Sequence, residues 1–144
     1  MKNTHTYVSE KNLFSKNTTF NLVKLAVSSC GSKTTSFSPQ NWNKNNPLLG
    51  HCTIVALVVQ DFYRGSLLRA SLKDTAFEYM HSHYWNRLPN GKEIDLTENQ
   101  FLGQKPRLIG KVRTRKHIIS NQETLNRYHL FKSKVIKKLN ELDN

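Results

Sequence analysis

The spacing of apolar residues along the chain predicts two helices in its first half. Residues 19–29 carry apolar side chains at loosely helical intervals, which is typical of a short amphipathic helix. A second run, from His51 or Cys52 to Tyr63, is apolar on all sides between Ile54 and Val59 and stops at Arg64-Gly65. Its β-branched residues also suit a strand. Because the run continues to Tyr63, we favour a buried central helix.

The middle of the chain reads as an antiparallel sheet. Alternating or aromatic-rich segments predict strands over 66–72, 77–88, 92–97 and 108–112, and Pro89-Asn90-Gly91 fits a three-residue hairpin loop. The capping-box pattern Ser120–Glu123 then opens a helix with one apolar face. Between the first two helices, the polar segment 31–46 is expected to be a long loop that Trp42 pins to the body.

Together these elements predict one α+β domain over residues 1–144, with a central buried helix packed on an antiparallel sheet. The 144-residue length suits a single compact domain. The polar residues 1–18 are expected to be flexible. No apolar run approaches the ~20 residues of a membrane span, and the start of the chain lacks an apolar signal core. We therefore expect a cytoplasmic protein without a membrane span.

The net charge of the chain indicates which kind of partner it would bind. The chain has 22 Lys and Arg against 10 acidic residues, a formal net charge of +12. Residues 103–144 alone hold eleven basic and three acidic residues, or +8. This imbalance favours an anionic partner, either nucleic acid or an acidic protein. The basic cluster in this segment, a candidate anion-binding site, consists of Lys111, Arg113, Arg115 and Lys116.

Cys52 is the first candidate for chemistry, because it stands at the start of the predicted central helix. Unpaired N–H groups and the helix dipole favour negative charge there, which lowers a thiol's pKa. The same N–H groups are suited to an oxyanion hole. Taken alone, Cys52 fits a small packed side chain better than a nucleophile. Two cysteines make no disulfide framework, and the histidines show no metal-site spacing, so neither metal nor cofactor is expected.

The predicted hairpin supplies two partners for Cys52. A three-residue loop sets Trp85 opposite Asp95, so His83 and Asp95 become diagonal neighbours on one face, ~7–8 Å apart at the backbone. A carboxylate there orients an imidazole and stabilises imidazolium. A two-residue loop would instead put His83 and Asp95 on opposite faces. Trp85 is a cleft candidate beside His83, with simple packing as the alternative.

The motifs in this order resemble two groups of proteins. His83-Tyr-Trp85, the turn with Gly91, and Asp95-Leu-Thr97 resemble the transglutaminase pattern, and Cys-then-His-then-Asp is the papain-like order. A longer stretch resembles the small, largely uncharacterised bacterial YunG-like family. The segments that carry this resemblance are Trp42, Asn46–Cys52, Ala56–Asp61, Gly65, His83–Leu88, Asp95–Thr97, Gln100-Phe101 and Arg127-Tyr128. His51 stands where the resemblance predicts Gln, and it is an oxyanion candidate as a hydrogen-bond donor.

Two functions follow as hypotheses. The first is cysteine-dependent acyl transfer or amide hydrolysis of a protein or peptide substrate on a papain/transglutaminase-like scaffold, with Cys52 as nucleophile, His83 as base and Asp95 as orienter. The alternative is an inactive scaffold of that kind that binds nucleic acid or an acidic protein through its basic C-terminal third.

Overall fold

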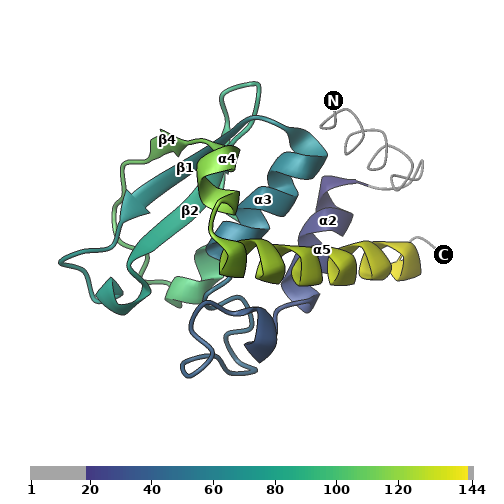
Figure 1. Ribbon diagram of the computed structural model, residues 1–144, viewed down its shortest axis with the longest axis horizontal. Coiled ribbons are helices and arrows are strands. Elements are labelled where there is room, and N and C mark those ends of the chain that lie inside the picture. The colour runs from purple at the N-terminus through teal and green to yellow at the C-terminus, as the bar shows by residue number, and fades with distance from the viewer. Residues whose placement is uncertain (1–18, 143–144) are drawn as a thin grey trace.

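The computed structural model describes residues 19–142, which form an α+β fold with helices on an antiparallel sheet (Figure 1). Residues 1–18, which the sequence predicts to be flexible, lie outside the described residues. The helices are α2 (Phe20–Ser29), α3 (Cys52–Tyr63), α4 (Arg115–Ile119) and α5 (Gln122–Leu142). The 3₁₀ turns are η1 (Lys33–Thr35), η2 (Glu78–Met80) and η3 (Glu98–Phe101).

The sheet has four antiparallel strands in the order β3-β2-β1-β4. Its strands are β1 (Ser66–Ser71), β2 (Ser82–Arg87), β3 (Glu93–Ile94) and β4 (Lys111–Arg113). The long strands β1 and β2 lie at the centre, and the two short strands form the edges (Figure 1). Short edge strands leave few backbone groups unpaired, which limits edge-to-edge association.

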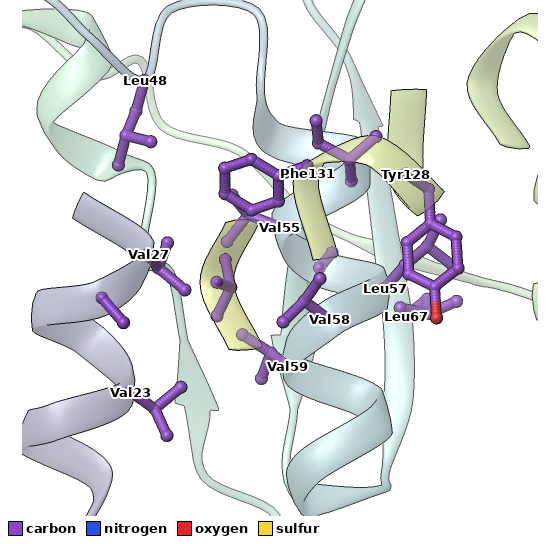
Figure 2. Close-up of a cluster of buried hydrophobic side chains, with 14 of the residues drawn as sticks. Val23, Val27, Leu48, Val55, Leu57, Val58, Val59, Leu67, Tyr128 and Phe131 are labelled. Carbon is purple, nitrogen blue, oxygen red and sulfur yellow. The ribbon is translucent and has the colours of Figure 1, made fainter. Parts of the chain in front are cut away.

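The main hydrophobic core surrounds α3, as the all-round apolar pattern predicts. Every residue from Ile54 to Val59 is buried, with at most 2% of its surface exposed. Side chains from α2, α3 and α5 converge on this cluster (Figure 2). On the sheet side, the buried Asn86 of β2 donates a hydrogen bond to the Ala56 carbonyl at 2.9 Å. The central buried helix packed on an antiparallel sheet is therefore confirmed.

Four predicted boundaries need correction. The strand expected over 77–88 is split, because Phe77 packs on Phe101 in a second cluster and the strand begins only after η2. The strand expected over 92–97 ends at Ile94, since the Asp95 carboxylate accepts the Thr97 N–H and turns the chain. The strand expected over 108–112 lies at 111–113. Asn121, rather than Ser120, caps α5 by accepting the Thr124 N–H.

The long segment between α2 and α3 folds back on the body. It contains η1, and the Trp42 indole N–H donates to the Pro47 carbonyl at 2.8 Å. The segment ends at Gly50, whose φ of 78° lies in the left-handed region. Within residues 19–142, no helix combines the length and apolarity that crossing a bilayer requires.

Candidate active site

Cys52 lies at the N-terminal end of α3. Cys52 is the first residue of the helix, and His51 before it makes no side-chain cap. The N–H groups of the first turn therefore remain available at this end of the helix. Cys52 lines a cavity of about 230 Å³ together with residues from the segment before α3, from the chain entering β2, and from α5.

The hairpin brings His83 and Asp95 together in the predicted register. Arg87 pairs with Glu93 and Asn86 with Ile94, which is the pairing that a three-residue loop requires. His83 Nε2 lies 2.7 Å from Asp95 Oδ2. This side of the hairpin, however, is not exposed: His83 retains 1% of its surface and Trp85 6%. The pair is therefore shielded from competing water, which strengthens its electrostatic interaction.

Several groups hold the Asp95 carboxylate in place. Its Oδ1 accepts hydrogen bonds from the Thr97 backbone N–H at 3.1 Å and the Thr97 hydroxyl at 3.2 Å. Its Oδ2 also accepts from Lys105 Nζ at 2.7 Å. Burial by itself raises the pKa of Asp95, but His83 and Lys105 outweigh burial and hold the pKa below its ordinary value.

His83 also interacts with the Cys52 thiol. Burial opposes ionisation of both groups, but the attraction between the thiolate and the His83 imidazolium outweighs burial, so the pKa of Cys52 falls below its ordinary value. The hydrogen bond with Asp95 and the neighbouring Cys52 thiol raise the pKa of His83 to about 9 against the same burial. Near neutral pH, this arrangement favours a thiolate–imidazolium pair.

Aromatic rings and one amide enclose the imidazole. Trp85 stacks on His83 with an interplanar angle of 19°, and Phe101 contacts it edge-on with centroids 4.9 Å apart. Gln100 Nε2 lies 3.4 Å from His83 Nδ1, and Gln100 Oε1 accepts the Gly50 N–H at 3.2 Å. These contacts fix the ring plane and place the Gln100 amide between His83 and the turn before Cys52.

Comparison of the sequence with known proteins identifies the family of this chain. A family model described as YunG protein matches residues 19–140. The chain belongs to the YunG family. No curated protein and no solved structure matches the chain significantly. The matched range includes Cys52, His83 and Asp95 of this YunG-family chain.

His51, the oxyanion candidate, is fully buried in this YunG-family protein. Its Nδ1 lies 3.0 Å from the Leu49 carbonyl, so that nitrogen carries the proton and donates. Its Nε2 accepts from the Ser32 N–H at 3.3 Å and lies 2.7 Å from the Thr35 hydroxyl. Burial lowers the pKa of His51 to about 4, so the ring is neutral near pH 7. The geometry favours an anchor for the loop, with no N–H left for an oxyanion.

The basic cluster of this YunG-family chain divides into two kinds of side chain. Lys111, Arg113 and Lys116 are exposed. Arg115 instead contacts Asp61 at 2.8 Å and donates to the Tyr128 hydroxyl at 2.8 Å. Its charge is therefore already compensated within the fold.

The structure adds two residues that the sequence did not single out for this site. Lys105 reaches Asp95 from the loop after η3, and Arg127 of α5 lines the cavity beside Cys52. Arg127 belongs to a segment that carries the family resemblance, but no local pattern places either residue at the site, because both are distant in sequence from the groups they face. Within residues 19–142, no group of three or more His, Cys, Asp or Glu side chains is placed to hold a metal ion.

Proposed function

We propose that this YunG-family protein is a cysteine-dependent acyl-transfer or amide-hydrolysing enzyme on a papain/transglutaminase-like scaffold. The observation that carries the proposal is the position of Cys52 at the start of α3, with its Sγ 3.9 Å from the carbonyl of Ser82, next to the buried His83–Asp95 pair. A nucleophile, a base and an orienting group are the three parts that such chemistry needs. Their positions, at the start of α3, on β2 and directly after β3, support the scaffold assignment.

Each group has one role in the reaction. The Cys52 thiolate attacks the carbonyl carbon of an amide, and the tetrahedral intermediate collapses to a thioester. The departing amine takes a proton from the His83 imidazolium. Water, or a second amine, then attacks the thioester and gives a proton to the neutral His83, and the departing Cys52 thiolate restores the thiolate–imidazolium pair. Asp95 keeps the ring oriented and stabilises its charged form throughout.

Two neighbouring groups are suited to stabilise the oxyanion. The backbone N–H of Cys52 belongs to the unpaired first turn of α3. The Gln100 amide lines the same cavity, and its orientation is set because Oε1 accepts the Gly50 N–H while Nε2 donates one proton to Thr97 Oγ1 at 3.2 Å. The second N–H of Nε2 lies on the His83 side and is the one suited to an oxyanion. Donors of this kind in a sheltered cavity stabilise developing negative charge.

The pH dependence of Cys52 alkylation by iodoacetamide tests this proposal. All variants carry Cys30→Ser, which removes the second thiol. Because the pKa of Cys52 is lowered and that of His83 is raised to about 9, the proposed pair holds more thiolate at acidic pH than an ordinary thiol does. We expect labelling at pH 6 to be at least tenfold faster than for an ordinary thiol, which titrates near ~8.5. His83→Ala should abolish this low-pH reactivity.

A folded His83→Ala protein is required for that comparison, so near-UV circular dichroism is measured on both proteins, and His83→Gln serves as a more conservative second variant. A single ordinary titration near pH ~8.5 in the unmutated site would refute the thiolate–imidazolium pair. Fast labelling that is identical in both His83 variants would also contradict the proposed role of His83.

The exposed part of the basic cluster favours one alternative, the binding of a polyanion without catalysis. Lys111, Arg113 and Lys116 lie exposed on β4 and α4. Several phosphate contacts would make affinity for a short duplex fall ~10³-fold between 50 and 200 mM salt. A triple Gln variant at these positions should reduce both the affinity and its salt dependence. Binding that ignores salt would exclude this electrostatic mode.

A further inference from the structure

Arg127 is a cation at the cavity, and among residues 19–142 it has no carboxylate within ion-pair distance. It lines the same cavity as Cys52, and it is half-buried. Three other partly buried cations pair with buried carboxylates: Lys105 with Asp95, and Arg115 and Lys132 with Asp61. Among the residues that the structure describes, no Asp or Glu forms an ion pair with Arg127, and none lines the cavity.

The guanidinium is held in place by neutral groups. Arg127 Nη1 donates to the Thr35 carbonyl at 3.2 Å, and the guanidinium lies 5.7 Å from the centre of the Phe37 ring. Its Nε is buried and has no hydrogen-bond partner among the described residues. A buried donor without a partner costs free energy, so a position of this kind is typical of a group that binds something.

The Arg127 guanidinium and the Cys52 thiolate interact electrostatically. Burial lowers the pKa of the Arg127 guanidinium, and negative charge at Glu123 and at the Cys52 thiolate partly opposes that effect. Glu123 is exposed and forms no ion pair with Arg127. The Cys52 thiol and the Arg127 guanidinium therefore line one cavity, whose volume of about 230 Å³ admits a small group.

We infer that Arg127 binds a carboxylate of the substrate, so that the enzyme selects acyl compounds with a negative charge close to the carbonyl that Cys52 attacks. Guanidinium groups bind carboxylates through charge-assisted hydrogen bonds, which are stronger than neutral ones. The inference rests on the proposed function, because it uses Cys52 as the attacking group. It adds the substrate class and the residue that would recognise it.

Two alkylating reagents of similar size, one a carboxylate and one neutral, provide the test. Iodoacetate and iodoacetamide both react with the thiolate, so the ratio of their rates does not depend on how much thiolate is present. The ratio is measured at pH 8.5 on the Cys30→Ser protein, where even an ordinary thiol reacts, and is compared with that of a neutral cysteine derivative. We expect the protein's ratio to exceed the reference at least tenfold.

Arg127→Met should lower this ratio roughly tenfold, which corresponds to the loss of one charged hydrogen bond. Arg127→Lys keeps the charge and should retain most of the preference. Lys137→Met is the matched control, because Lys137 is exposed on the same helix and its loss changes the net charge equally. The control should leave the ratio as it is in the parent protein.

Three results would overturn the inference: a parent ratio equal to the reference, a ratio that Arg127→Met leaves unchanged, or an equal fall in Lys137→Met, which would assign the preference to the overall charge of +12. The proposed function fails separately, through slow iodoacetamide labelling at pH 6. The ratio at pH 8.5 still reports on Arg127 in that case, so the two failures are distinguishable.

Discussion

At the scale of the single residue, His83 is the group whose surroundings decide the chemistry of the site. Burial alone would keep the imidazole neutral at pH 7. Asp95, which is hydrogen-bonded to the ring, and the neighbouring Cys52 both favour the charged form of His83, and together they outweigh burial. His51 illustrates the opposite outcome, because it is buried without a carboxylate and its pKa falls to about 4. The pKa values of these two buried histidines are therefore shifted in opposite directions.

Replacing Asp95 by Asn should lower the pKa of His83 from about 9 toward its ordinary value of ~6.5, because the removed carboxylate favoured the imidazolium form. The ring signals of His83 in an NMR titration report this pKa directly. Glu98→Gln is the matched control, since Glu98 also contacts Lys105, at 3.6 Å, but is exposed. A His83 titration midpoint that stays near 9 in Asp95→Asn would contradict the proposed role of the carboxylate.

At the scale of the element, the turn at Gly50 sets the point where α3 begins. The Gly50 carbonyl accepts the Phe37 N–H at 2.8 Å, and the Gly50 N–H donates to Gln100 Oε1. The turn thereby joins the loop before α3 to η3, next to both Cys52 and His83. Its left-handed φ of 78° and its close neighbours together explain why a glycine stands here.

Gly50→Ala should destabilise the fold by ~3 kcal/mol, measured by urea unfolding. A Cβ at this position would lie 2.2 Å from Ser36 Oγ and 2.8 Å from the Phe37 backbone nitrogen. Gly103→Ala is the matched control, because Gly103 has a similar φ of 83° but nothing within 4 Å. That variant carries only the backbone strain, ~1 kcal/mol. Equal losses in both variants would show that packing around Gly50 contributes nothing.

At the scale of the whole molecule, one buried carboxylate connects three helices. Asp61 of α3 accepts from Arg115 of α4 at 2.8 Å and from Lys132 of α5 at 2.9 Å. The Tyr128 hydroxyl of α5 also donates to it. Asp61 is 4% exposed, so the cluster lies largely outside water. It holds α4 and α5 against α3, and therefore holds the part of the cavity that α5 contributes.

Asp61→Asn should lower the free energy of unfolding by ~3–5 kcal/mol, because it removes the buried carboxylate that Arg115 and Lys132 both contact. Asp74→Asn is the control, since Asp74 is exposed and its change should stay within ~0.5 kcal/mol. Urea unfolding measures both. If the Asp61 variant is as stable as the control, the helices are held by apolar packing alone.

Local patterns in the sequence were sufficient to predict the central helix and the hairpin of this structure. The all-round apolar run predicts the buried α3, and the length of the Pro89–Gly91 loop predicts the hairpin register. The register in turn predicts that His83 and Asp95 meet. Helical period and loop length depend on neighbouring residues, so one sequence carries this information by itself. The same reasoning misplaced strand ends, because Asp95 and Phe77 form contacts that compete with the sheet ladder.

Only the tertiary structure decided which carboxylate each basic side chain contacts, because the two residues of each pair are far apart in the sequence. It assigned Arg115 to Asp61 and Lys105 to Asp95, and it placed Arg127 at the cavity with no carboxylate partner among the described residues. It also engaged both ring nitrogens of His51 in the loop. A basic residue looks the same in the sequence whether its charge is paired or available. The difference arises from burial and from which side chains the packing brings within a few ångströms, and neither is encoded in the nearby sequence.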